Sequence, residues 1–183
     1  MRRSQPVHVV HLAHIDTPIG EMIAAASDEH LVLLEYVHRR TVDAQLERVK
    51  RAVPGLYEPG SSPIIDQVRA QLDEYFGGER REFDVPLLTP GTPFQERVWN
   101  ALRRIPHGET TSYGRVARSI GQPDAVRAVA RANGDNRVAI IIPCHRVIGA
   151  DGSLTGYGGG LWRKKKLLTL EARAHELSLF DQE

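Results

Sequence analysis

The chain has 183 residues, of which 41% are hydrophobic and 26% are charged, and its net charge is +1. This composition is typical of a soluble globular protein with one or two domains. No apolar run is longer than residues 138–142, and the basic start of the chain is not followed by an apolar stretch, so we expect neither a membrane span nor a signal peptide. A single cysteine excludes an intramolecular disulfide, and we therefore expect a reducing, cytoplasmic compartment.

The charges are unevenly distributed along the chain. Residues 1–90 carry 10 basic and 14 acidic side chains, a net charge of −4, whereas residues 91–183 carry 14 basic and 9 acidic side chains, a net charge of +5. A polyanionic partner is therefore expected to meet the second half. A charge of this size is also common in proteins that bind no polyanion.

Residues 1–90 are predicted to form a small domain that contains both strands and helices. Segments rich in β-formers alternate with turn residues and predict a strand meander at residues 7–15, 21–26 and 31–37. Two amphipathic helices are predicted to follow, one after Thr41 and one that begins at Ser62-Pro63.

Residues 91–183 are predicted to be mostly helical, after a linker around Pro90. The sequence Thr92-Pro93-Phe94-Gln95 has the pattern of a capping box at the start of a helix. Two further short helices, at residues 112–120 and 123–133, are spaced as in a helix-turn-helix. Because any small helical hairpin shares this spacing, the pattern alone does not establish DNA binding.

The second of these short helices has a face of small side chains. Ala125, Ala128 and Ala132 recur on that face, which could approach a nucleic-acid groove closely, and Arg127 and Arg131 flank it. The alternative is a helix whose alanines only favour helicity and whose arginines are solvated.

The single cysteine, Cys144, follows the apolar run at residues 138–142 and precedes His145 and Arg146. A cysteine attacks only as its thiolate, and a neighbouring base or cation increases the thiolate fraction. His145 and Arg146 are candidates for this role. The alternative is a cysteine that acts as a small, buried apolar residue.

Two other groups of side chains are interpreted as features of the surface. His8, His11 and His14 point to alternating faces of a predicted strand, so we expect no metal site there. The lysine run at residues 164–166 is interpreted as a solvated helix face, with phosphate contact as the alternative.

Several spaced motifs resemble the methylated-DNA protein-cysteine methyltransferases, the O6-alkylguanine DNA alkyltransferase family. The resemblance covers about residues 91–172 and is carried by short segments that occur in the same order. They are residues 92–95 with Trp99, residues 105–110, residues 112–114, residues 127–129 with Asn136, residues 143–147 and residues 156–160. It implies an α+β protein in which a small amino-terminal α/β, RNase H-like domain (residues 1–90) precedes a mostly helical, DNA-binding and alkyl-accepting domain with a helix-turn-helix (residues 91–183).

The resemblance also implies the residues that carry out the reaction. Cys144 is the alkyl acceptor, and His145 draws its proton through a bound water. Glu171 forms a hydrogen bond with His145 and orients it. Cys144, His145 and Glu171 would then act as the nucleophile, base and carboxylate of a catalytic triad. Tyr113 donates a hydrogen bond to N3 of the leaving guanine. Asn136 connects the second helix of the helix-turn-helix, predicted at residues 123–133, to the turn that contains Cys144.

The same resemblance implies double-stranded DNA with alkylated bases as the partner, bound by a monomer that can be cooperative on DNA, with no cofactor. The residues expected to contact DNA are Arg127, Tyr113, Ala125, Ala128 and Arg131. The residues expected to form the substrate pocket are Val147, Tyr157, Gly158 and Gly159, with the carbonyls of Cys144 and Val147 reading the guanine amino group.

Two positions depart from the family pattern. Arg137 follows Asn136 where many members have proline, and Gly158 stands where some members have serine. Two alternative functions also remain open at this stage. One is a regulator that binds alkylated DNA without accepting the group, although such relatives lack the cysteine. The other is a Cys-His hydrolase that turns over repeatedly.

Overall fold

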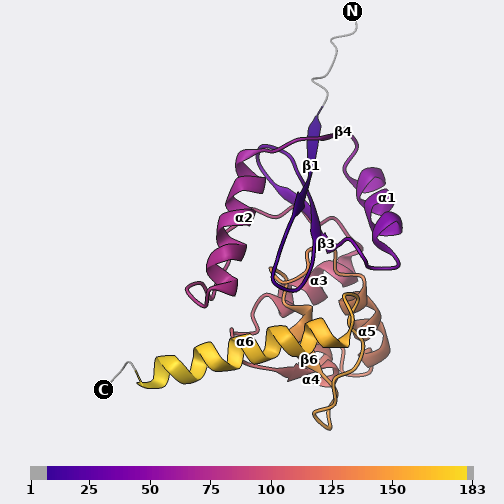
Figure 1. Ribbon diagram of the computed structural model, residues 1–183. Coiled ribbons are helices and arrows are strands. Elements are labelled where there is room, and N and C mark those ends of the chain that lie inside the picture. Colours follow the sequence, from indigo (N-terminus) through magenta and orange to yellow (C-terminus); the bar gives the residue numbers. More distant parts are fainter. Residues whose placement is uncertain (1–7, 181–183) are drawn as a thin grey trace, which may run out of the picture.

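The structure is a computed structural model that describes residues 8–180, with side chains described as far as residue 174. A sheet domain formed by the first half of the chain lies against a helical domain formed by the second half (Figure 1). The long last helix crosses the helical domain and projects from it. No helix of the described part has the length and apolarity that a membrane span requires.

The amino-terminal sheet has four strands in the order β3-β2-β1-β4. Their bounds are β1 Val9–Ile15, β2 Met22–Ala26, β3 Leu31–Tyr36 and β4 Leu56–Pro59. The first three form the predicted antiparallel meander, whereas β4 pairs with β1 in parallel. Strand β4 was not predicted, because it is short, half-exposed and ends in proline, so it lacks the alternation of a half-buried strand.

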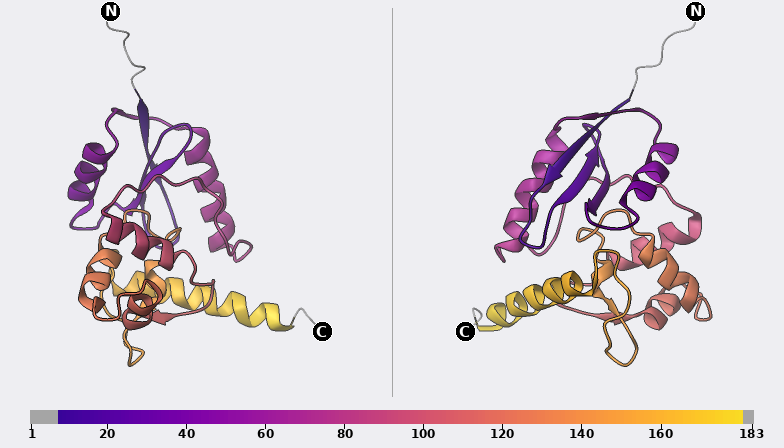
Figure 2. Two further views of the ribbon diagram at one scale, coloured as in Figure 1. Left: turned by 180° about the vertical axis from the view of Figure 1, so that it is seen from behind. Right: turned by 45° about the vertical axis from the view of Figure 1, so that its right-hand side comes forward.

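Two helices cover opposite faces of this sheet (Figure 2). Helix α1 (Val42–Ala52) packs Val49 into one apolar cluster, and α2 (Pro63–Phe76) packs its buried stripe into the other. Helix α2 begins where predicted, because the Ser62 hydroxyl accepts from the amide of Ile65 at 3.4 Å and proline occupies the first turn.

The helical domain contains α3 to α6 and a short parallel pair of strands. Their bounds are α3 Pro93–Leu102, β5 Thr111–Ser112, α4 Tyr113–Ser119, α5 Val126–Gly134, β6 Val147–Ile148 and α6 Leu161–Phe180. The predicted capping box is present at the start of α3, where Thr92 and Gln95 exchange side-chain and backbone hydrogen bonds. The predicted α+β class and helix-turn-helix are confirmed, the latter formed by α4 and α5.

Helix α5 differs from its prediction in two respects. It begins at Val126 rather than at Pro123, which leaves Ala125 as its N-cap residue. Ala132 is 2% exposed and belongs to the core, so it does not share an open face with Ala128, which is exposed. The predicted face of three alanines was therefore wrong at its third member, because one side of this short helix must pack against α3.

The edge of β3 joins the two domains through the backbone. Leu34 donates its amide to the carbonyl of Arg137 at 2.9 Å and accepts from the amide of Ala139 at 2.8 Å. The apolar run that follows is not a strand but a series of turns in which Ile140 has a φ of 72°. A β-branched residue is strained in this region, and the close packing of the run holds it there.

Candidate active site

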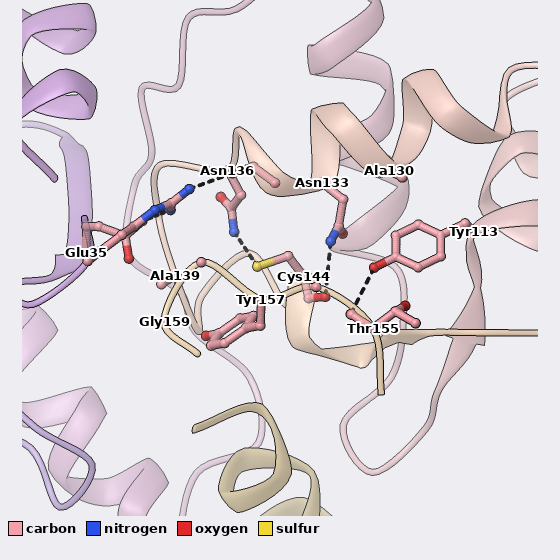
Figure 3. A pocket seen from close by; sticks show the side chains of 14 residues that line it. Glu35, Tyr113, Ala130, Asn133, Asn136, Ala139, Cys144, Thr155, Tyr157 and Gly159 are labelled. Atoms are coloured by element: carbon pink, nitrogen blue, oxygen red, sulfur yellow. Dashed lines mark hydrogen bonds and ion pairs between the residues drawn. The ribbon is translucent and has the colours of Figure 1, made fainter. Parts of the chain in front are cut away.

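Cys144 lies at the start of a single 3-10 turn, Cys144–Arg146, immediately after Pro143. Its side chain is 6% exposed and contributes to the wall of a cavity of about 460 Å³ (Figure 3). The cavity is lined by Glu35, Arg39, Tyr113, Ala130, Asn133, Gly134, Asn136, Ala139, Cys144 and residues 155–159. Both domains therefore contribute to the space in front of the thiol.

Asn136 holds the cysteine turn in place. Its Nδ2 donates to the carbonyl of Ile142 at 2.9 Å and lies 3.1 Å from Sγ of Cys144, while its Oδ1 accepts from the amide of Val138. Asn136 therefore bridges the end of α5 and the cysteine turn. Asn133, which the sequence analysis did not select, donates to the carbonyl of Cys144 at 3.5 Å.

The thiol of Cys144 is protonated at neutral pH. Burial raises its pKa to about 11, and the hydrogen bond from Asn136 only partly opposes this effect. The hypothesis that His145 and Arg146 give Cys144 a low pKa is wrong for this state of the protein. Both side chains instead bond to the buried carboxylate of Glu171.

His145 is completely buried and lies 2.8 Å, from Nε2 to Oε1, from the carboxylate of Glu171. Burial lowers the pKa of His145, so the imidazole is neutral. Because an ionised carboxylate only accepts hydrogen bonds, Nε2 carries the proton and Nδ1 keeps its lone pair. Nδ1 is buried and has no hydrogen-bond partner among the described residues, so it is the free basic atom of this pair.

Glu171, on α6, accepts five hydrogen bonds. They come from His145, from Nε and Nη2 of Arg146 at 2.9 Å each, from the hydroxyl of Tyr75 at 2.7 Å and from the amide of Gly108 at 3.2 Å. Although burial by itself raises the pKa of Glu171, the bonds from His145 and Arg146 hold it well below the ordinary value. Tyr75 lies on α2. No motif in the sequence marks it as a residue of the site.

Tyr113 and the glycine-rich loop at residues 156–160 form the outer walls of the cavity. The Tyr113 hydroxyl lies 3.4 Å from the carbonyl of Thr155, and the Tyr157 hydroxyl lies 3.2 Å from that of Tyr36. Gly158 and Gly159 complete this wall. Of the expected pocket residues, Val147 alone is not among those that line the cavity.

Lys164 corrects the interpretation of the lysine run. Its side chain is fully buried, and Nζ donates to the carbonyls of Val147 at 2.6 Å and Thr155 at 2.8 Å. The other two lysines of the run are exposed, as expected. Lys164 thereby ties the glycine-rich loop to the strand that follows the cysteine turn, and it engages the Val147 carbonyl that was expected to read guanine.

The residues expected to contact DNA lie on and beside α5. Arg127, Ala128 and Arg131 are exposed, and Ala125 is half-buried. Ala130 on the same helix lines the cavity (Figure 3). The exposed side chains of α5 therefore lie next to the opening that leads to Cys144.

Comparisons with known proteins agree with this arrangement. Residues 10–89 match the 6-O-methylguanine DNA methyltransferase, ribonuclease-like domain, and residues 93–173 match the DNA-binding domain of the same family. The chain is 48% identical to the methylated-DNA–protein-cysteine methyltransferase of Mycobacterium tuberculosis strain H37Rv, over 94% of this chain and 100% of the relative. It is 43% identical to the constitutive enzyme of Bacillus subtilis, over 84% and 89% of the two chains.

Solved structures give the same result. The crystal structure of the M. tuberculosis O6-methylguanine methyltransferase is 46% identical, has a TM-score of 0.78 and covers 93% of this chain and 99% of that one. The structure of M. tuberculosis OGT in complex with DNA is 47% identical, also has a TM-score of 0.78 and covers 90% and 94%. The fold and the site thus define a two-domain protein with a buried cysteine at a cavity wall and a helix-turn-helix. The chain belongs to the methylated-DNA–protein-cysteine methyltransferase family.

We predict that Glu171→Gln destabilises the protein by about 3–5 kcal/mol at pH 7, because it leaves the charge of Arg146 buried without a partner. Urea unfolding measures this change. Glu47→Gln is the control, since its partner Lys50 forms an exposed pair on α1, and it should change the stability by less than about 1 kcal/mol.

The effect of Glu171→Gln should also depend on pH. The folded state depresses the pKa of Glu171, so its contribution is fully present above the ordinary value of 4.5 and is lost as the pH falls below it. The two proteins should therefore converge in stability in acid. A difference that stays constant down to pH 3 would contradict the assignment of the low pKa to Glu171.

We also predict that iodoacetamide alkylates Cys144 slowly at pH 7 and about tenfold faster for each further pH unit, still without a plateau at pH 9.5, because the thiol pKa is about 11. Mass spectrometry of the Cys144 peptide gives the rates. The urea-unfolded protein is the control and should reach its plateau near the ordinary thiol pKa of about 8.5. A plateau below pH 8.5 in the folded protein would show that the resting cysteine is a thiolate.

Proposed function

We propose that this protein repairs O6-alkylguanine in double-stranded DNA by moving the alkyl group onto Cys144. The observation that carries the proposal is the buried thiol at the cavity wall, followed directly by a neutral histidine that a buried carboxylate orients. Membership of the family supports the same reaction, since the relatives named above are methylated-DNA–protein-cysteine methyltransferases.

The protonated resting thiol requires a base at the moment of reaction. In the proposed step, Nδ1 of His145 takes the thiol proton through an intervening water as Sγ attacks the alkyl carbon. The new S–C bond forms while the bond from that carbon to O6 breaks, and its electron pair stays on guanine. The carboxylate of Glu171 stabilises the imidazolium that results.

The leaving guanine needs stabilisation of its negative charge. Burial raises the pKa of Tyr113, so its hydroxyl keeps its proton and can donate a strong hydrogen bond to the guanine N3. The guanine then takes a proton from its surroundings, which balances the one that left the thiol. We assign Gly158 and Gly159 to the pocket wall and an amide of this loop to O6, and the carbonyl of Cys144 to the guanine amino group.

The lesion has to leave the DNA stack before it can react, because the thiol is only 6% exposed. We assign Arg127 to the space that the base vacates, and Ala125, Ala128 and Arg131 to the surface that approaches the groove. From the resemblance we infer that this helix enters the minor groove, which suits small side chains and little sequence preference. Phosphate contacts should supply most of the affinity, which should fall as salt rises.

The product is an S-alkylcysteine, whose thioether offers no leaving group that water can displace. The chain has no second cysteine to accept the alkyl group. Each molecule should therefore act once. We further propose that it acts as a monomer that can bind DNA cooperatively, in the cytoplasm, and that the acceptor thiol makes a cofactor unnecessary for the transfer.

The first test is mass spectrometry after incubation with a duplex that contains one O6-methylguanine. We expect the Cys144 peptide to gain one CH2, with saturation at one group per protein. Cys144→Ser should bind the same duplex and gain nothing. Lesion binding by the wild type without alkylation would indicate a recognition protein, and continued release of product would indicate a hydrolase.

A second test separates base extrusion from chemistry. Arg127→Ala should slow the repair of duplex DNA by about tenfold or more, because unstacking costs a few kcal/mol that the arginine offsets, while the reaction with the free base O6-methylguanine should remain unchanged. Arg118→Ala, at the exposed end of α4, is the control. Equal losses on both substrates in Arg127→Ala would contradict its role in extrusion.

A further inference from the structure

The amino-terminal domain contributes two charged side chains to the cavity in front of Cys144. Glu35 lies near the end of β3 and Arg39 lies in the turn that follows, and both line the same cavity as the thiol. In Figure 3, Glu35 and Tyr113 lie on opposite sides of Cys144. The proposed function places the guanine within hydrogen-bonding reach of the Tyr113 hydroxyl, so the far end of a long O6-alkyl group points toward Glu35 and Arg39.

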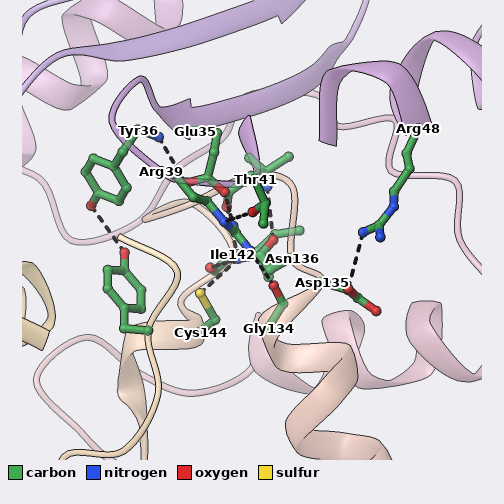
Figure 4. Close-up of polar contacts among 12 residues, drawn as sticks. Glu35, Tyr36, Arg39, Thr41, Arg48, Gly134, Asp135, Asn136, Ile142 and Cys144 are labelled. Atoms are coloured by element: carbon green, nitrogen blue, oxygen red, sulfur yellow. Dashed lines mark hydrogen bonds and ion pairs between the residues drawn. The ribbon is translucent and has the colours of Figure 1, made fainter. Parts of the chain in front are cut away.

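This ion pair is held rigidly. Arg39 is ion-paired with Glu35, donates from Nε to the hydroxyl of Thr41 at 2.8 Å and donates from Nη2 to the carbonyl of Gly134 at 2.7 Å (Figure 4). Glu35 is 1% exposed and also accepts from the amide of Tyr36 at 2.9 Å. Because both charges are partnered and Glu35 is buried, displacing the pair would leave charges uncompensated in an apolar setting.

The glycine-rich loop is fitted closely against Arg39 and Tyr36 of the amino-terminal domain. A Cβ on Gly158 would lie 2.5 Å from Cζ of Arg39, and one on Gly159 would lie 2.5 Å from the ring of Tyr36. Gly158, one of the two departures from the family pattern, is thus a position where the guanidinium occupies the space of a side chain. Arg163 fixes the loop by donating to the carbonyl of Gly159 at 2.7 Å and stacking on Tyr36.

We infer that the Glu35–Arg39 pair closes the alkyl-group end of the cavity and makes this protein selective for small or polar O6-alkyl groups. A methyl group needs only the space next to Sγ. A butyl or benzyl group has to contact the ion pair or push it aside, and neither the pair nor the loop opposite can move without losing the contacts described above. This inference rests on the proposed function, because it concerns the substrate range of that reaction.

The wild-type protein tests the inference with a series of duplexes that carry O6-methyl-, ethyl-, propyl-, butyl- or benzylguanine, in single-turnover reactions. We expect rate constants to fall by about tenfold or more between ethyl and butyl. The 2-hydroxyethyl group, which has the same number of heavy atoms as propyl but ends in a hydroxyl, should react faster than propyl. Butyl and benzyl rates equal to the methyl rate would overturn the inference, whereas no methyl transfer at all would overturn the proposed function instead.

The variant test removes both charges together, since either one alone would leave its partner buried and unpaired. In Glu35→Ala/Arg39→Ala, the ratio of benzyl to methyl rate constants should rise by about tenfold or more. Arg48→Ala is the matched control, because Arg48 also spans the two domains, 3.5 Å from Asp135, but does not line the cavity. Its ratio should equal that of the wild type.

If the double alanine variant does not fold, Glu35→Gln/Arg39→Gln replaces it, since glutamines keep hydrogen-bonding groups while they shorten the arginine and remove both charges. The same rise in the benzyl to methyl ratio is expected. A folded variant of either kind that transfers methyl groups with an unchanged ratio would overturn the inference.

Discussion

The carboxylate of Glu171 is the centre on which the arrangement of this site depends. A buried carboxylate is tolerated only when hydrogen bonds and opposite charge replace its hydration, and here two adjacent residues of the cysteine turn, His145 and Arg146, supply both. The remaining partners, Tyr75 and Gly108, come from the sheet domain and from the segment after α3. One ionised group thus fixes the histidine tautomer and connects α6, the cysteine turn and the amino-terminal domain.

Burial of the nucleophile has a cost and a benefit. It raises the pKa of Cys144 to about 11, so the resting cysteine is a thiol. A thiol reacts with unrelated electrophiles much more slowly than a thiolate does. In the reaction that we propose, reactivity then requires an occupied cavity, with the alkyl carbon placed against Sγ and a path for the proton to His145. A reagent that is consumed by one reaction gains from this arrangement, because a premature reaction would waste the whole molecule.

The amino-terminal domain does more than support the helical one. Tyr75 donates to the carboxylate behind the histidine, Tyr36 and Arg39 shape the space around the glycine-rich loop, and Leu34 pairs with the backbone that leads to the cysteine turn. These contacts explain why the loop carries glycine at two positions that face this domain. They also place charged groups from the first half of the chain in a cavity whose chemistry belongs to the second half.

The sequence by itself determined most of the elements, with β4 and the start of α5 as exceptions, and the reaction class. Local rules fixed the meander, the starts of α2 and α3 and the helix-turn-helix, because caps, prolines and apolar periodicity act within a few residues. The ordered motifs around Cys144 identified the family and the candidates His145, Glu171, Tyr113 and Asn136. Only the tertiary structure decided that the thiol is protonated, that Lys164 is buried, and that Tyr75, Glu35 and Arg39 belong to the site. The reason is that pKa values and cavity walls depend on burial and on contacts between residues far apart in the chain, such as Tyr36 and Tyr157, which are 121 positions apart. No local pattern records such contacts.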